Sequence, residues 1–177
     1  GYGQGVNGFM AYCERSGVTV SLAEAQNAVN TYRNLFKNVV SFWYKRADEV
    51  IKNEYLTLPS GRRIIYDDLK QENDEWTFVH LPIFRKKKTI ERTKFWHGLA
   101  VENMVQATAR DVLFEMLLDL RKAGVNILFQ IHDELVGICD DESQKDLILE
   151  RMSRCNLLPD IPLKAEVSFG KTLEDVS

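Results

Sequence analysis

Cysteine is scarce in this sequence, and its spacing narrows the class of protein. Cys13, Cys139 and Cys155 are the three cysteines among 177 residues, and they show no C-x-x-C spacing. Three thiols cannot all pair with one another, and the lack of a disulfide framework is typical of a reducing, intracellular setting. Without C-x-x-C pairs, the sequence also gives no indication of a zinc site.

Long apolar runs are absent as well. None approaches the ~20 residues that span a membrane, and no signal-peptide pattern occurs, so we expect no membrane partner. The glycine-rich opening, residues 1–8, has neither the G-x-G-x-x-G nor the P-loop spacing and indicates a loop or the frayed end of a helix. The chain has no internal repeat or clear linker, and its length suits one domain or part of a larger one.

Charge of both signs is present but unevenly distributed. The net charge of −3 alone argues against a nucleic-acid partner. However, residues 1–100 contain 15 Lys and Arg against 11 Asp and Glu, whereas residues 101–177 contain 8 against 15. A basic part beside an acidic part is typical of a protein that binds a polyanion near a carboxylate–metal centre, although it also arises by chance.

Helical periodicity predicts several helices around a small antiparallel sheet, that is, an α+β fold. We expect a short helix over residues 9–15. A long helix begins at the capping box Ser21-Leu22-Ala23-Glu24 and breaks near Asn38. A third runs from Thr93 to Gly124, and a fourth covers residues 141–155.

Strand patterns are fewer. Residues 56–58 and 62–66 flank a Pro59-Ser60-Gly61 turn and predict a hairpin. Residues 71–75 indicate a polar loop, and residues 163–169 alternate as a final strand. Arg62 and Arg63 leave the hairpin turn together, which suits either a phosphate contact or a solvated strand end.

The most informative stretch is residues 127–139, where apolar runs flank His132, Asp133 and Glu134. Read as one strand, it would place Asp133 on an apolar face, and a buried unpaired carboxylate is costly. Either His132-Asp133 is the tip of a hairpin that joins two buried strands, or the carboxylate is held there to bind a cation. The two readings are compatible, and Asp also occurs in turns for backbone reasons alone.

A polar stripe lies along the helix expected after Thr93. Asn103, Gln106 and Arg110 are spaced i, i+3 and i+7 and therefore share one face. Such side chains can donate hydrogen bonds to acceptors, for example the minor-groove edges of base pairs. An ordinary solvated face is the alternative.

Together these features resemble family A DNA polymerases, the group that includes bacterial DNA polymerase I and many phage replicases. The resemblance runs nearly end to end and in order. Its segments are Tyr2-Gly3, similar to the close of motif B; Gly61-Arg62-Arg63, similar to a family hairpin; residues 105–111, similar to the helix that lays a Gln in the minor groove; residues 130–136, similar to motif C; and residues 162–167, similar to the last palm strand.

The resemblance implies a single partial polymerase domain over residues 1–177. Residues 1–98 would form the end of the fingers with connecting helices and a hairpin, and residues 99–177 the palm with motif C. The implied reaction is template-directed nucleotidyl transfer to a primer 3′-hydroxyl by a two-metal mechanism. The implied partners are primer–template DNA and a dNTP, and the implied location is the cytoplasm of a bacterium or phage-infected host.

Carried over residue by residue, the resemblance gives Asp133 the role of Mg²⁺ ligand and Glu134 that of an accessory carboxylate. His132 would touch the primer end, Gln106 would read acceptors common to all base pairs, and Tyr2 would lie beside the templating base and the incoming nucleotide.

The remaining implied contacts are with DNA. Arg62 and Arg63 are candidates for the DNA backbone, and Arg110 lies on the same face as Gln106. The family places an Asn four residues before its Gln, where this chain has Glu102, so Asn103 is expected to take that role.

Two parts of the family's site have no counterpart in the sequence. Motif A, which carries a second metal-binding Asp, and the fingers Arg and Lys that neutralise the triphosphate both precede the segment resembled here. We therefore expect this chain alone to be incomplete and inactive, with one strong metal ligand, and to need an upstream segment carrying motif A. A palm divided in this way exposes a sheet edge through which two copies can pair as a homodimer.

Two other functions fit the same residues. One is a non-catalytic duplex-binding prophage remnant, which predicts DNA binding that weakens steeply with salt. The other is an unrelated α+β enzyme that uses His132, Asp133 and Glu134 as an acid–base set.

Overall fold

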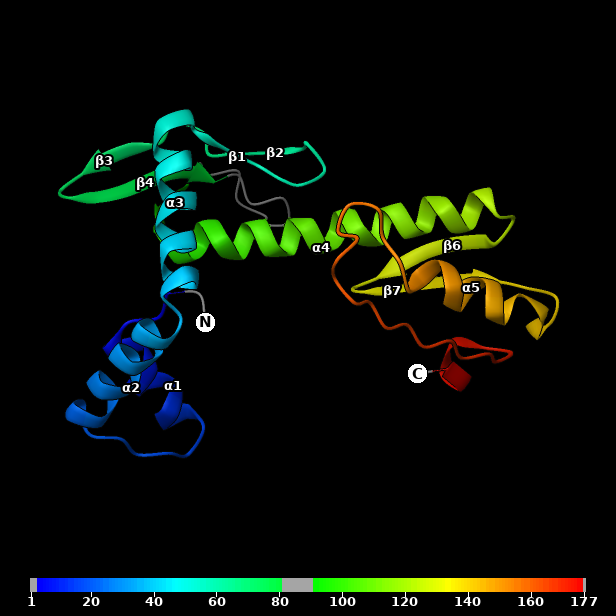
Figure 1. Ribbon diagram of the computed structural model, residues 1–177, viewed down its shortest axis with the longest axis horizontal. Helices are drawn as coiled ribbons and strands as arrows, with labels where there is room; N and C mark the ends of the chain where they lie inside the picture. Colours follow the sequence, from blue (N-terminus) through cyan, green and yellow to red (C-terminus); the bar gives the residue numbers. More distant parts are fainter. Residues whose placement is uncertain (1–2, 81–90, 177) are drawn as a thin grey trace. The chain divides into compact units, whose positions relative to one another are not determined.

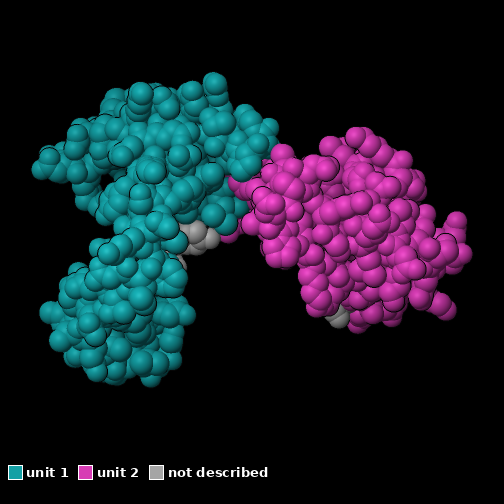
Figure 2. All heavy atoms as spheres, viewed as in Figure 1, with its two compact units in different colours: residues 1–105 teal, residues 106–177 magenta. Residues whose placement is uncertain are grey.

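The computed structural model describes residues 3–80 and 91–176. These residues form five α-helices and seven strands, the latter in three separate antiparallel sheets (Figure 1). The predicted α+β fold is confirmed, although the single sheet expected is divided. The chain forms two compact units, residues 1–105 and 106–177 (Figure 2). The predicted division of one polymerase domain after residue 98 stays a prediction.

The first unit begins with α1 (Val6–Arg15), α2 (Leu22–Leu35) and α3 (Lys37–Asn53). The predicted capping box is present, because Ser21 Oγ accepts from Glu24 N at 3.3 Å and Glu24 Oε2 accepts from Ser21 N at 2.8 Å. The break between the second and third helices falls at Phe36, slightly earlier than the position predicted.

Strands β1 (Tyr55–Thr57) and β2 (Arg63–Ile65) form the first hairpin, as predicted. Gly61 has φ 81°, a backbone conformation that side chains with a Cβ rarely adopt, and its N–H donates to Leu58 O at 2.9 Å. The turn therefore requires glycine at this position, and Arg62 follows it directly.

The second sheet has the order β3 (Lys70–Glu72), β4 (Glu75–His80), β5 (Glu91–Phe95). The loop expected over residues 71–75 is wrong. Asn73 and Asp74, at φ 50° and 64°, form the two-residue turn that joins β3 to β4, the backbone geometry that suits a tight hairpin.

The helix start expected at Thr93 is also wrong, because Thr93 pairs with Phe78 inside this sheet. The neighbouring Arg92 holds β5 in place. Its guanidinium donates to Asp68 Oδ2 at 2.8 Å and Asp68 O at 2.7 Å, and to Thr77 Oγ1 at 2.9 Å and Thr77 O at 3.0 Å. These contacts join residues far apart in sequence, and the helix begins only at His97.

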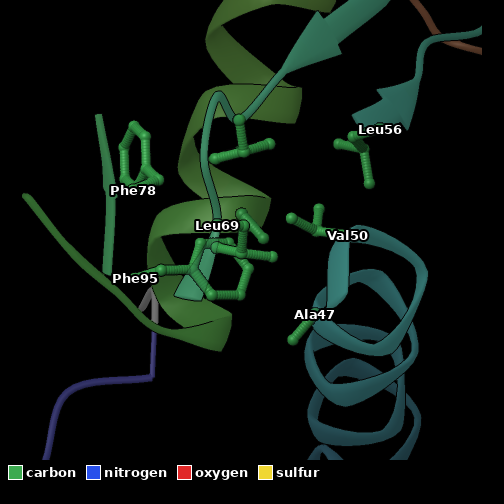
Figure 3. Packing of buried hydrophobic residues seen from close by; sticks show 8 residues of the cluster. Ala47, Val50, Leu56, Leu69, Phe78 and Phe95 are labelled. Atoms are coloured by element: carbon green, nitrogen blue, oxygen red, sulfur yellow. The ribbon is translucent and has the colours of Figure 1, made fainter. Parts of the chain in front are cut away.

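An apolar cluster draws on α3, both sheets and the start of α4. Figure 3 shows side chains of α3 and of the strands gathered in it. The ring of Tyr66 is 1% exposed and meets Phe78 and Phe95 edge-on, at centroid distances of 5.1 and 5.2 Å. The cluster contains Ala47, Val50, Leu56, Tyr66, Leu69, Phe78, Phe95 and Ala100.

Helix α4 (His97–Lys122) is 26 residues long and ends before Gly124, whose φ is 89°, as predicted. Its later turns contribute Val112 and Met116 to the core of the second unit, where they pack with Cys155. No described helix, α4 included, is both long and apolar enough to cross a membrane.

The carboxylate of Glu115 anchors the segment after the last helix to α4. It accepts from Cys155 Sγ at 2.8 Å, Asn156 N at 3.0 Å, Asn156 Nδ2 at 2.8 Å and Leu157 N at 3.2 Å. The Cys155 hydrogen bond is the largest of the effects that hold the pKa of Glu115 below its ordinary value.

The last part of the chain differs from expectation in two places. The helix predicted over residues 141–155 forms as a 3₁₀ turn, Glu142–Gln144, followed by α5 (Lys145–Met152). The strand predicted over residues 163–169 is absent, because a strand needs a neighbouring backbone and no described segment pairs with it.

We expect Glu115→Ala to lower the free energy of unfolding by about 1–3 kcal/mol at pH 7, because it leaves the donors of residues 155–157 without their acceptor. The folded-state pKa lies below the ordinary 4.5. The stabilisation is therefore fully present above about pH 4.5 and is lost as the pH falls through the folded pKa.

Urea denaturation between pH 3 and pH 7 measures both effects. Glu150→Ala is the matched control, because Glu150 forms an exposed pair with Arg154 at 2.7 Å. An equal loss in the two variants, or a Glu115→Ala difference that does not shrink on acidification, would contradict the anchoring role.

Candidate metal and DNA-binding site

The stretch singled out in the sequence forms a hairpin, and His132-Asp133 is its two-residue turn. Strand β6 (Asn126–Ile131) pairs with β7 (Glu134–Ile138), with Ile131 opposite Glu134. His132 has φ 52°, and Gln130 Nε2 donates to His132 O at 2.7 Å, which stabilises the turn from the strand side. The hairpin prediction is thus confirmed.

The side chains of the hairpin strands are more exposed to solvent than predicted. Leu128, Phe129, Ile131 and Ile138 are 52%, 42%, 41% and 56% exposed. The expectation of two buried strands is therefore wrong for this chain, because the described residues place too little against the sheet to cover it. Gly137 permits close strand pairing, since a Cβ there would lie 2.8 Å from Asn126 O.

The turn presents two carboxylates to solvent. Asp133 and Glu134 are exposed, and neither carboxylate has a side-chain hydrogen bond or ion pair among the described residues. Carboxylate oxygens are the ligands that Mg²⁺ prefers, so the donor type fits this ion. Over residues 3–80 and 91–176, however, no three His, Cys, Asp or Glu side chains gather closely enough to hold a metal, so the role of Asp133 as a Mg²⁺ ligand stays a prediction.

The polar stripe of α4 divides into exposed and half-buried members. Gln106 and Arg110 are exposed, and the Arg110 guanidinium carbon lies 5.4 Å from the centre of the Phe114 ring. Asn103 is half-buried, and its Nδ2 donates to the Tyr66 hydroxyl at 3.0 Å. The DNA roles of all three stay predictions, but one Asn103 N–H is already engaged inside the first unit.

The arginines of the first hairpin are exposed. The Arg63 guanidinium carbon lies 4.3 Å from the centre of the Tyr55 ring, a cation–π contact that orients the side chain along the hairpin. Arg62 follows Gly61 and is also exposed. Both remain candidates for a phosphate contact.

Tyr2 lies outside the described residues, and its predicted role stays a prediction. Gly3, which follows it, has φ 76°, and a Cβ there would lie 2.4 Å from His97 Nε2. Burial is the larger of two effects that lower the pKa of His97, and the nearby Arg33 charge is the other. A cavity of about 290 Å³, lined in part by Tyr32, Arg33 and Trp43, opens beside Gly3.

Two residues of interest were missed from the sequence. The sequence pattern predicts Tyr66 only as the end of a strand, and its partner Asn103 is 37 residues away, so no local pattern joins them. His97 lies in the predicted helix and begins α4, but its ring contacts were not predicted: the ring stacks on Trp43 at 5.9 Å and lies against Gly3.

Comparison with known proteins decides the family. The model of DNA polymerase family A matches residues 2–175, almost the whole chain. The chain belongs to DNA polymerase family A. A DNA polymerase of Bacillus phage SP02 is 32% identical over 154 residues, which is 71% of this chain and 24% of that protein. DNA polymerase I of Treponema pallidum (strain Nichols) is 23% identical over 179 residues, 96% of this chain and 16% of that protein.

A solved structure of the family has the same fold. The POL domain of Pol1 from M. smegmatis, in complex with DNA primer-template and dNTP, matches 97% of this chain with a TM-score of 0.60 and 22% identity. The chain spans 28% of that structure and 24% or less of the two polymerase sequences above. It therefore corresponds to a segment of these family A proteins.

Because the Asp133 side chain is exposed and has no described partner, we expect Asp133→Asn to change the free energy of unfolding by less than about 0.5 kcal/mol. Thermal and urea unfolding of the chain measure this value. A loss above about 1 kcal/mol would show that the carboxylate stabilises the fold instead of being free for a ligand.

Proposed function

We propose that this chain is a segment of a DNA-directed DNA polymerase that transfers a nucleotide to a primer 3′-hydroxyl under the direction of a template. The single observation that carries the proposal is the exposed His132-Asp133 turn between two paired strands in a member of DNA polymerase family A. A rigid hairpin turn holds a carboxylate at a fixed position, which catalysis by bound metal ions requires.

In this proposal Asp133 is a ligand for Mg²⁺ and Glu134 is an accessory carboxylate beside it. When bound, a pair of metal ions lowers the pKa of the attacking hydroxyl and stabilises the charge on the leaving oxygens. The chain's own contribution is to hold Asp133 at the tip of β6 and β7 and to place His132 against the primer end. The further carboxylate is supplied by an upstream segment carrying motif A.

Exposed polar side chains form the proposed DNA contacts. Gln106 can donate to the minor-groove acceptors that every base pair presents, so it senses pairing geometry without reading sequence. Arg110, Arg62 and Arg63 provide positive charge for the phosphate backbone. Tyr2, outside the described residues, is the proposed contact for the templating base and the dNTP. Asn103 is considered separately below, because its amide already bonds to Tyr66.

The apolar hairpin indicates where the rest of the polymerase attaches. Leu128, Phe129 and Ile138 are exposed to solvent. Removing apolar surface from water is favourable by roughly 25 cal/mol per Å², so a covering segment would stabilise this hairpin. We propose that the upstream polymerase segment covers this hairpin. The proposed location of the polymerase is the cytoplasm of a bacterium or phage-infected host. Without that segment, the same surface and the free strand edges can pair with a second copy of the chain.

A non-catalytic duplex-binding prophage remnant is the second candidate. It is favoured by one observation: within the described residues, Asp133 and Glu134 are not joined by a third metal-binding side chain. This protein would bind duplex DNA with a steep salt dependence and would not respond to replacement of Asp133.

The proposal is tested with a chimera of the Bacillus phage SP02 polymerase. In this chimera, the present chain replaces the matching region of the phage protein. We expect template-directed primer extension with Mg²⁺ and four dNTPs, and a loss of roughly 10³-fold or more for Asp133→Asn, because a metal ligand contributes several kcal/mol to the transition state. Asp140→Asn is the matched control, since Asp140 is exposed and lies beyond the end of β7.

If the Asp133→Asn chimera extends primers at a rate within twofold of the parent chimera, Asp133 is not a metal ligand. A chimera that binds duplex DNA but does not extend primers, while the unaltered phage polymerase does, would favour the remnant.

A further inference from the structure

Tyr66 lies at the base of the hairpin that carries Arg62 and Arg63. It follows β2 directly, its N–H donates to Glu54 O at 2.8 Å, and its side chain is 1% exposed. Close packing against two phenylalanine rings leaves it little freedom to move independently of the core. Whatever holds Tyr66 therefore holds the end of the hairpin.

The hydroxyl of Tyr66 accepts from Asn103 Nδ2 at 3.0 Å. Asn103 lies in the second turn of α4 and is half-buried. Burial raises the pKa of Tyr66, the Asn103 hydrogen bond acting in the opposite direction, so the hydroxyl stays neutral at pH 7. A hydrogen bond between neutral groups in a packed interior is electrostatically stronger than one in water, and a partner left unsatisfied there is costly.

The hairpin needs such an attachment because it is short. Strands β1 and β2 have three residues each, and an isolated two-stranded hairpin of this size is marginally stable. Within the hairpin, Leu56 and Leu58 are buried, while Arg62 and Arg63 near its turn are exposed. Thr57 N donates to Glu49 Oε1 of α3 at 3.2 Å, and the hydrogen bond between Asn103 and Tyr66 ties the base of the hairpin to α4.

We propose that Tyr66 and Asn103 are a positioning pair, whose hydrogen bond fixes the β1–β2 hairpin to α4 so that Arg62 and Arg63 meet the DNA backbone already in place. The inference rests on the proposed function, since it supposes that these arginines contact DNA. It gives Asn103 a role through Tyr66 instead of the direct DNA contact predicted from the sequence. Pre-ordering of this kind reduces the entropy lost when side chains and loops are immobilised on binding.

The test is the affinity of the 177-residue chain for a fluorescent primer–template duplex, measured by anisotropy at several salt concentrations. Tyr66→Phe and Asn103→Leu each remove the hydrogen bond, and each is expected to weaken binding by roughly 2- to 10-fold, the factor that one hydrogen bond contributes. The double variant is expected to bind DNA no more weakly than the weaker-binding single variant, because both substitutions remove the same hydrogen bond. The salt slope stays unchanged, because no phosphate contact is removed. Tyr12→Phe is the control, since Tyr12 is 57% exposed.

A second cycle separates positioning from simple support of the fold. Arg63→Ala is expected to weaken binding and to reduce the salt slope by about 0.9 in the wild-type background. In the Tyr66→Phe background the same change has a smaller effect, because the arginine is no longer held in position. A variant that merely lost stability would show a lower thermal midpoint with unchanged affinity of the folded fraction.

Three results would overturn the inference. If Tyr66→Phe binds like wild type, while Asn103→Leu weakens binding in both the wild-type and the Tyr66→Phe chain, Asn103 is a direct DNA ligand. If Tyr66→Phe, Asn103→Leu and the double variant all bind like wild type while Arg63→Ala weakens binding, the pair is only structural, and the proposed function still stands. If the wild-type chain has no affinity for the duplex, the proposed DNA-binding function fails and this inference fails with it.

Discussion

Burial of apolar residues along α4 is the interaction on which both units depend. Ala100 is fully buried in the cluster that also contains Tyr66, and Val112 and Met116 pack in the cluster that contains Cys155. Side chains at i, i+3 and i+4 spacing provide one such face, and the remaining face is free for polar residues. Gln106 and Arg110 occupy that exposed face, so the same helix that builds the cores also presents the candidate DNA contacts.

Polar contacts complete what apolar packing leaves undetermined. Glu115 on α4 holds the segment after α5, Arg92 holds β5 against its neighbours, and Asn103 holds Tyr66. In each case one side chain joins elements that are distant in sequence. The same side chain provides hydrogen-bond partners for donors or acceptors that folding removes from water. The β6–β7 hairpin is different, since its register is set by pairing and by the turn while its apolar side chains stay half-exposed. This contrast is why we propose an upstream segment as its cover.

Local patterns in the sequence were enough for some elements. The Ser21 capping box, the Gly61 turn and the hairpin at His132-Asp133 were all predicted, because each depends on the backbone preferences or alternation of consecutive residues. The family was also recognised from motif order, which the family match over residues 2–175 confirms. The roles of Asp133, Glu134, His132 and Gln106 stay predictions, since exposure and geometry alone do not assign chemistry.

Other features could not be predicted because distant contacts determine them. The Asn73-Asp74 turn lacks the glycine that marks most tight hairpins. Strand β5 depends on pairing with β4, and Arg92 adds contacts to Asp68 and Thr77. The strand expected over residues 163–169 has the right alternation, but no described backbone pairs with it. Asn103 looked like part of a uniform polar stripe, and only the fold shows that it points to Tyr66.

We propose above that β6 and β7 form part of a polymerase palm and are covered by an upstream polymerase segment. Amide hydrogen exchange of residues 126–138, in the isolated chain and in the phage SP02 chimera, tests it most directly. We predict exchange at least about tenfold slower in the chimera, with the amides of residues 112–120 in α4 changing much less. Equal exchange of the hairpin in both proteins, at the level of the α4 core, would contradict the claim.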